Sequence, residues 1–122
     1  MSIPKVFASE YRFCCILWEH EPIKSSDLVK LCNEKLEWKK STTFTVLKRL
    51  SDRGILKNEN SIVTSLVCKD EILSAESHEI VEKTFGGSLP QFIAAFTKEK
   101  GLSTAEITEI KRMIEQFDEE ES

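Results

Sequence analysis

The 122-residue sequence has few glycines, prolines, cysteines and histidines: it contains 4, 3, 4 and 2 of them. Glycine and proline at this level exclude a collagen-like or low-complexity chain. No apolar run approaches the roughly 18 residues of a membrane span, and no apolar stretch of the signal-peptide kind follows the first residues. We therefore expect a cytoplasmic protein without a membrane-inserted segment.

The cysteines have no spacing typical of a metal or redox site. Cys14 and Cys15 are adjacent, Cys32 and Cys68 stand alone, and neither histidine lies at a ligand spacing from them. This pattern predicts small buried side chains in a reducing compartment, with no metal and no cofactor. Redox sensing by an accessible thiol is the alternative, for which Cys68 is the best candidate because it lies at a predicted hinge.

Catalytic motifs are also absent from the sequence. It contains no phosphate-binding glycine loop, no nucleophile elbow and no histidine–carboxylate pair at a catalytic spacing. Gly86-Gly87 precedes a predicted helix start, and we interpret it as a helix stop. We therefore predict that the protein is not an enzyme.

The charge is unevenly distributed along the chain. Residues 1–67 carry 11 Lys and Arg against 8 Asp and Glu, a net +3, whereas residues 68–122 carry 6 against 13, a net −7. The overall charge is −4. Such asymmetry is typical of a chain with a nucleic-acid-binding surface in its basic part.

The first part of the chain has the order of elements found in a winged helix-turn-helix domain. Helical spacing of apolar residues and cap residues predict three helices, which begin at Ser9, at Ser25-Ser26-Asp27 and at Ser41-Thr42. The first ends at Glu21-Pro22, and Gly54 ends the third. Two extended runs, residues 55–57 and 61–67, flank the turn Asn58-Glu59-Asn60 and predict a β-hairpin. A winged module that binds protein has the same order.

The third predicted helix has two different faces. At 100° per residue, Thr43, Val46, Leu47 and Leu50 share one side. In a helix-turn-helix protein the opposite, outward side of this helix enters the major groove of DNA. The candidate DNA-binding residues on or beside that side are Lys39, Lys40, Ser41, Thr42, Phe44, Thr45, Lys48, Arg49 and Arg53.

Phe44 is an unusual residue for a solvated helix face, and two interpretations of it remain open. Its ring could pack on a thymine methyl group in the major groove. Alternatively, it could fold back against Trp38 or the hairpin.

Residues 69–122 are predicted to form a helical dimerisation domain behind a DNA-binding domain of residues 1–68. Helices are expected to begin at Asp70, Ser88 and Ser103, and Glu106 is placed to form a capping box with Ser103. Their apolar residues recur at helical spacing, and three such stripes exceed what a small domain can cover. The candidate dimerisation residues are Ile72, Leu73, Ile80, Val81, Leu89, Phe92, Ile93, Phe96, Ile107, Ile110, Ile114 and Phe117.

Nearly the whole chain resembles the penicillinase repressors of the BlaI/MecI type and the related CopY-type repressors. The resemblance rests on residues 9–19, on Trp38 with residues 41–56, and on the motifs at 85–89 and 102–107. It implies a mainly α fold with a small β-hairpin, in which a winged helix-turn-helix domain is followed by a helical dimerisation domain. It also implies a homodimeric repressor of an inducible resistance or stress-response gene, such as a β-lactamase gene, bound to a palindromic operator on double-stranded DNA.

In that family a membrane sensor triggers loss of DNA binding, and the repressor is cleaved at an Asn-Phe bond. The corresponding bond here is Ala95-Phe96, where Ala replaces the family's Asn. The C-terminal cysteines of the CopY type are absent, which excludes copper control through that site. The competing hypothesis is a winged-helix adaptor that binds protein without sequence-specific DNA binding.

Overall fold

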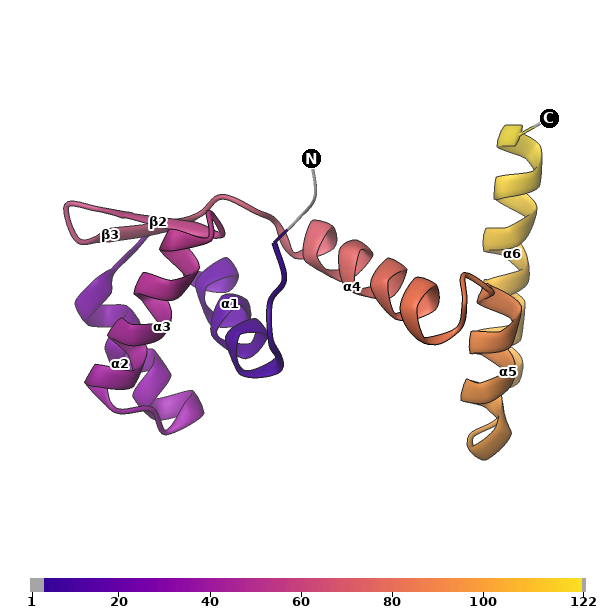
Figure 1. Cartoon of the computed structure of the whole chain (residues 1–122), viewed down its shortest axis with the longest axis horizontal. Helices are drawn as coiled ribbons and strands as arrows, with labels where there is room; N and C mark the ends of the chain where they lie inside the picture. Colours follow the sequence, from indigo (N-terminus) through magenta and orange to yellow (C-terminus); the bar gives the residue numbers. More distant parts are fainter. Residues whose placement is uncertain (1–3, 122) are drawn as a thin grey trace. The chain divides into compact units, whose positions relative to one another are not determined.

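The structure is a computed structural model that describes residues 4–121, and it divides into two compact units (Figure 1). The first unit extends to His78 and the second begins at Glu79. Helices predominate beside a small antiparallel sheet, which confirms the predicted fold class. The functional boundary between residues 68 and 69 stays a prediction, because helix α4 contributes residues to both units.

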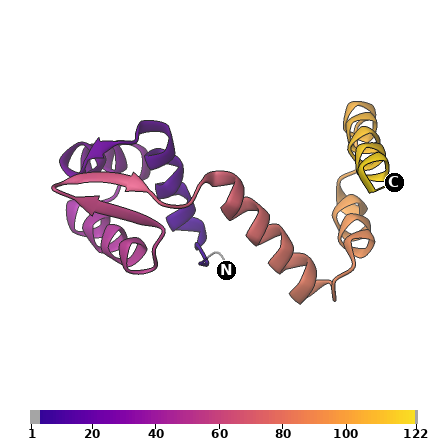
Figure 2. The same ribbon diagram turned by 90° about the horizontal axis from the view of Figure 1, so that it is seen from above.

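The first unit contains three helices and a three-stranded sheet ahead of the start of α4. The hairpin strands β2 and β3 lie beside the three helices (Figure 2), and β3 contacts α1 while β2 contacts α3. The elements are α1 (Ala8–His20), β1 (Ile23–Lys24), α2 (Ser25–Leu36), α3 (Lys40–Asp52), β2 (Leu56–Glu59) and β3 (Ile62–Ser65).

All three of these helices begin earlier than predicted. Their N-cap residues are Phe7, Lys24 and Lys39, none of which caps through its side chain, so the caps expected at Ser25-Ser26-Asp27 and at Ser41-Thr42 are wrong. Other groups satisfy the free N–H groups there. In α1 the Glu10 carboxylate accepts from the Phe7 N–H at 3.0 Å, and at α2 the Ser61 carbonyl accepts from the Ser25 N–H at 2.8 Å. A side chain in the first turn therefore caps α1, whereas a tertiary contact replaces the local cap of α2.

The sheet has the strand order β1-β3-β2, and both pairings are antiparallel. Residues 23–24, expected only as an extended link, form β1 and pair with β3. The hairpin turn lies at Asn60-Ser61, where φ is 52° and 63°, and not at residues 58–60 as predicted. Two consecutive positive φ angles are typical of the tight two-residue turns whose twist suits a hairpin.

One apolar core holds the first unit together. It combines side chains from α1, α2 and α3 with Ile55, Leu56, Val63 and Val67. Ile72 at the start of α4 belongs to the same core and is 1% exposed. Its assignment to the dimerisation surface is therefore wrong, because its own chain already covers it.

Burial controls the chemistry of two cysteines in this core. Cys14 and Cys32 are buried, and desolvation raises the pKa of their thiols to about 12 and about 11. Cys68 is exposed. Since the thiolate is the reactive form, iodoacetamide at pH 8 is expected to modify Cys68 rapidly and to reach Cys14 and Cys32 only after unfolding, as read by mass spectrometry. Rapid labelling of Cys14 in the folded protein would contradict this expectation.

The second unit consists of the end of α4 (Lys69–Thr84) with α5 (Leu89–Glu99) and α6 (Thr104–Glu121). The predicted caps are confirmed here. The Ser88 hydroxyl accepts from the Gln91 N–H at 3.2 Å, and Ser103 and Glu106 form a reciprocal capping box at 2.9 and 3.1 Å. Within residues 4–121, no helix is both long enough and apolar enough to cross a bilayer.

Candidate nucleic-acid interface

Helix α3 separates a buried apolar face from an exposed polar face, as its sequence predicts. Thr43, Val46, Leu47 and Leu50 are at most 4% exposed. The opposite side presents polar and basic side chains, which are Ser41, Thr42, Thr45, Lys48 and Arg49 together with Phe44. Burial of one face fixes the rotation of the helix about its axis, so the other face is held toward solvent. Contact between this face and DNA stays a prediction.

The connection between α2 and α3 holds the start of α3 in place. Glu37 adopts a left-handed conformation with φ of 58°, which ends α2. The Trp38 ring then stacks on Phe13 at 5.9 Å and 10°. The side-chain amide of Asn33 donates to the Trp38 carbonyl at 3.1 Å. This short connection leaves Lys39 and Lys40 exposed at the N-terminus of α3.

Glu10 is a buried carboxylate beside the C-terminal end of α3, and the sequence did not identify it. Its side chain is 2% exposed and pairs with the Arg53 guanidinium. The other terminal nitrogen of the guanidinium, Nη1, donates to the Lys5 carbonyl at 2.7 Å. Arg53 was predicted to bind DNA, but these contacts hold it against α1 and the chain before α1. Arg53 therefore has a structural role in the first unit, and its contact with DNA stays a prediction.

Arg49 differs from Arg53 although both lie near Glu10. Its Nε atom is 3.9 Å from the Glu10 carboxylate, yet its side chain is 58% exposed. One edge of the guanidinium therefore faces an internal anion while the side chain remains accessible to solvent. The separation of 3.9 Å is too long for a hydrogen bond, so Glu10 attracts the Arg49 guanidinium without holding it as it holds Arg53.

Replacing Arg53 by alanine is expected to lower the free energy of unfolding by about 2–3 kcal/mol, because the buried Glu10 carboxylate loses its paired charge. The value lies below that of a fully buried pair because Arg53 is 29% exposed. Urea unfolding measures the change. Lys48→Ala is the matched control, since it removes an exposed cation from the same helix; equal stability of the two variants would contradict the structural role.

The hairpin offers little positive charge to DNA. Lys57 is the one basic residue between positions 56 and 65, and its ammonium lies 3.8 Å from the Glu59 carboxylate. The hairpin is held by Glu21, whose carboxylate accepts from the N–H and hydroxyl of Ser65, both at 2.8 Å. The basic groups available for DNA phosphates are therefore concentrated on and before α3.

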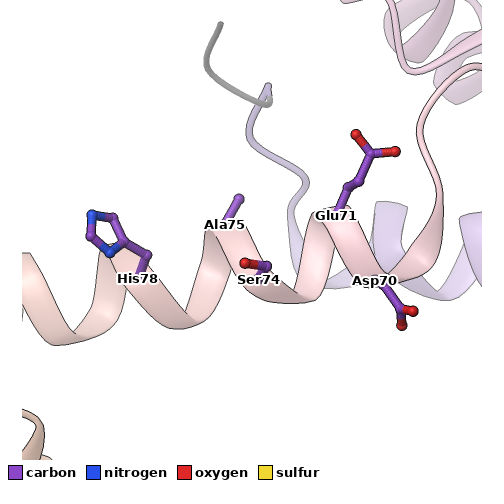
Figure 3. A pocket seen from close by; sticks show the side chains of 5 residues that line it. All are labelled: Asp70, Glu71, Ser74, Ala75 and His78. Atoms are coloured by element: carbon purple, nitrogen blue, oxygen red, sulfur yellow. The ribbon is translucent and has the colours of Figure 1, made fainter. Parts of the chain in front are cut away.

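A surface cavity of about 520 Å³ lies along the start of α4 (Figure 3). Asp70, Glu71 and His78 contribute to it, but their side chains point in different directions. Hydrogen bonds from Cys68 hold the pKa of the Glu71 carboxyl below its usual value. Among the described residues, no three His, Cys, Asp or Glu side chains are grouped so that they could hold a metal ion.

The second unit and the adjoining part of α4 expose an unusual number of apolar side chains. Among the predicted dimerisation residues, the exposed ones are Leu73, Ile80, Leu89, Ile93, Phe96, Ile107, Ile114 and Phe117. Val81, Phe92 and Ile110 are half-buried. Met113, which the sequence analysis did not select, is 55% exposed on α6. The predicted cleavage position, Ala95-Phe96, lies within α5 and is also exposed.

Helices α5 and α6 enclose an apolar cavity of about 270 Å³ in the second unit. The residues that line it are Phe92, Ile93, Phe96, Thr97, Leu102, Glu106 and Ile110. The Phe92 ring also packs on Phe85 at 5.4 Å and 81°. The half-buried Phe92 and Ile110 and the exposed Ile93 and Phe96 of the predicted set therefore share one apolar cavity.

Comparison with known proteins identifies the family. The family model described as Penicillinase repressor matches residues 8–116. The chain belongs to the penicillinase repressor family. Its members are transcriptional regulators and not enzymes, so this chain is a DNA-binding transcriptional repressor. The predicted resemblance is thereby confirmed.

Individual relatives of this penicillinase repressor homologue are distant in sequence. The penicillinase repressor of Bacillus licheniformis is 23% identical over 118 residues, covering 93% of this chain and 92% of the relative. An uncharacterized 16.5 kDa protein of Latilactobacillus sakei is 26% identical over 114 residues, covering 90% of this chain and 78% of the relative.

Two solved structures share the fold of the first part of the chain. The DNA-binding domain of the repressor BlaI matches with a TM-score of 0.53 at 22% identity, over 58% of this chain and 93% of that one. Monomeric Bacillus licheniformis BlaI in complex with the blaP half-operator matches with a TM-score of 0.51 at 23% identity, over 57% and 90%. These matches support the winged-helix fold.

Proposed function

We propose that this repressor acts as a homodimer on an inverted-repeat operator, with one α3 in the major groove of each half-site. The observation that carries the proposal is the exposed polar face of α3 over a fully buried opposite face. The regulated gene is an inducible resistance or stress-response gene such as a β-lactamase gene. The structure of the similar BlaI monomer in complex with the blaP half-operator supports DNA as the partner.

The DNA-binding residues of the proposal are those that remain accessible around α3. They are Lys39, Lys40, Ser41, Thr42, Phe44, Thr45, Lys48 and Arg49. Lysine and arginine side chains contact phosphates and fix the register, whereas polar groups in the first turns of a recognition helix reach base edges. Arg53 is left out because Glu10 and the Lys5 carbonyl hold it.

The exposed apolar side chains of α4, α5 and α6 form the proposed dimer surface. Ile107, Ile114 and Phe117 lie on one side of α6 at heptad-like spacing and are 39%, 61% and 67% exposed. A monomeric protein rarely leaves so much apolar surface in water. A dimer would cover it and would place two recognition helices about 34 Å apart, one turn of DNA.

Loss of repression is proposed to follow cleavage within the second unit by a membrane sensor protease in a cytoplasmic setting. The bond Ala95-Phe96 lies in α5 and is followed by all of α6. A cut there detaches α6 from the DNA-binding part of the chain. Separated monomers bind an inverted repeat weakly, because the second half-site contact no longer benefits from a high effective concentration.

The second candidate function is a winged-helix adaptor that binds protein. The exposed Phe44 ring favours it, since an aromatic side chain on a polar face also suits a protein partner. Salt dependence separates the two functions. DNA binding weakens steeply with salt because phosphate neutralisation releases counterions, whereas an apolar protein contact does not.

Selection of genomic DNA fragments by the purified full-length protein at two salt concentrations tests the proposed function. The expected result is enrichment of a short inverted repeat whose binding weakens with salt, and the neighbouring genes identify the regulated function. A folded, dimeric protein that enriches no sequence at low salt would overturn the proposal and favour the adaptor.

A further inference from the structure

Phe44 is the one large apolar side chain on the polar face of α3. It is 37% exposed, although Ser41, Thr45 and Lys48 around it are polar or charged. The Lys40 ammonium, one helical turn earlier, lies 5.9 Å from the centre of its ring. The core of the first unit does not include Phe44, so core packing does not explain an aromatic residue at this position.

The nearby aromatic residue that could have covered Phe44 is already engaged. Trp38 stacks on Phe13 with the rings nearly parallel, at 10°. Thr45, the next residue on the polar face, turns its hydroxyl back to the Ser41 carbonyl at 2.9 Å. The hydroxyl of Thr45 is therefore partly satisfied within the helix, and the Phe44 ring is the main apolar group available to a ligand at this face.

The position of Phe44 along α3 indicates what the ring meets. Helix α3 begins at Lys40, so Phe44 lies at the start of its second turn. Residues in the N-terminal part of a recognition helix contact base edges. A phenyl ring has no hydrogen-bonding group, and among the four bases thymine alone presents a methyl group in the major groove.

We propose that Phe44 packs on the C5-methyl group of one thymine in each half-site and thereby selects a T·A pair at that position. This inference rests on the proposed function and adds the base that the site recognises. Lys40 supports the contact, because its ammonium lies 5.9 Å from the centre of the ring and a lysine at the start of a recognition helix can contact a DNA phosphate.

The test uses a synthetic duplex of the selected inverted repeat and the full-length dimer. Symmetric thymine pairs are replaced in turn by deoxyuridine, which removes the methyl group and keeps the hydrogen-bonding groups. At one position the wild-type protein is expected to lose about fourfold in affinity per half-site, or about 15-fold in all, the effect of one buried methyl group on each side. Phe44→Ala is expected to bind both duplexes equally, and Phe44→Leu to retain part of the difference.

A second set of duplexes tests whether the protein distinguishes thymine from 5-methylcytosine, since both bases carry a methyl group at C5. The T·A pair is replaced by cytosine·guanine or by 5-methylcytosine·guanine. The wild-type protein is expected to bind the methylated cytosine more tightly than cytosine, but less tightly than thymine, and Phe44→Ala is expected to lose the difference. Preference for 5-methylcytosine over thymine would overturn the assignment of thymine.

Other outcomes distinguish this inference from the function on which it rests. Binding of the repeat with no thymine whose methyl group depends on Phe44 would refute the inference and leave the repressor function intact. Loss of a protein partner by Phe44→Ala, with operator binding unchanged, would assign the ring to protein docking. If the wild-type protein selects no repeat, both proposals fail. Thermal unfolding of Phe44→Ala should match the wild type, because the core does not include this side chain.

Discussion

Replacement of both Lys48 and Arg49 by alanine is expected to abolish specific operator binding. Both side chains are exposed on the outward face of α3, and the Arg49 side chain is 58% exposed. A dimer presents four such side chains, and each base or phosphate contact contributes about 1 kcal/mol or more. We therefore expect the affinity to fall by at least about a thousandfold, and the dependence on salt to become less steep as phosphate contacts are lost.

Fluorescence anisotropy with a labelled operator duplex measures this loss. The matched control is Lys98→Ala with Arg112→Ala, which removes the same two residue types from exposed positions of α5 and α6. Circular dichroism and sedimentation should show that both double variants remain folded and dimeric. Near-normal affinity of the Lys48→Ala, Arg49→Ala protein would show that α3 is not the recognition helix.

Ile114→Asp is expected to convert the dimer into monomers and to weaken operator binding by about 10²–10⁴, since each half-site is then bound independently. Ile114 is 61% exposed within its own chain, so its replacement removes no intramolecular packing of note. In a dimer the new carboxylate would be buried among apolar side chains without a partner, which is strongly unfavourable. Ile110 is a less informative position, because it lines the cavity between α5 and α6.

Sedimentation equilibrium and operator titration measure the two effects of Ile114→Asp. Gln116→Asp introduces the same charge two residues later, on the other side of α6, and is expected to remain dimeric. The thermal unfolding of the first unit should be unchanged in both variants. A dimer that survives Ile114→Asp would place the dimer surface elsewhere.

The two faces of α3 could be predicted from the sequence because helical periodicity is a local property. Thr43, Val46, Leu47 and Leu50 recur at the spacing that places them on one side, and the structure buries all four. The caps at Ser88 and Ser103 were predicted for the same reason, since the partners are three residues away.

The start of α2 could not be predicted in this way, because Ser25 donates its N–H to the carbonyl of Ser61, which is distant in the sequence. In α1 the Glu10 carboxylate accepts from the N–H of Phe7, three residues earlier, which is a local contact that the sequence analysis missed. The pairing of residues 23–24 with β3 is non-local in the same way as the contact at the start of α2. Contacts between distant segments override the local preference of serine and threonine for N-cap positions.

In the candidate interface, too, local features could be predicted from the sequence and contacts between distant residues could not. Exposure of Lys48 and Arg49 follows from their place on the helix, and the sequence predicted it, whereas the sequence left the position of the Phe44 ring open. The fate of Arg53 depends on Glu10, 43 residues earlier in the chain, and no local pattern links the two. Ile72 likewise has the spacing of the apolar stripe that follows it, yet it packs into the core of the first unit.

The order of helices and hairpin, the outward face of α3 and the family could all be predicted, because they depend on residue types at short spacings. Which charged and apolar side chains remain accessible depends on tertiary packing. Arg53 is paired internally while Arg49 stays exposed, and Ile72 is buried while Ile114 is exposed. Accessibility depends on which distant segments pack together, and the spacing of residue types along the chain does not specify that packing.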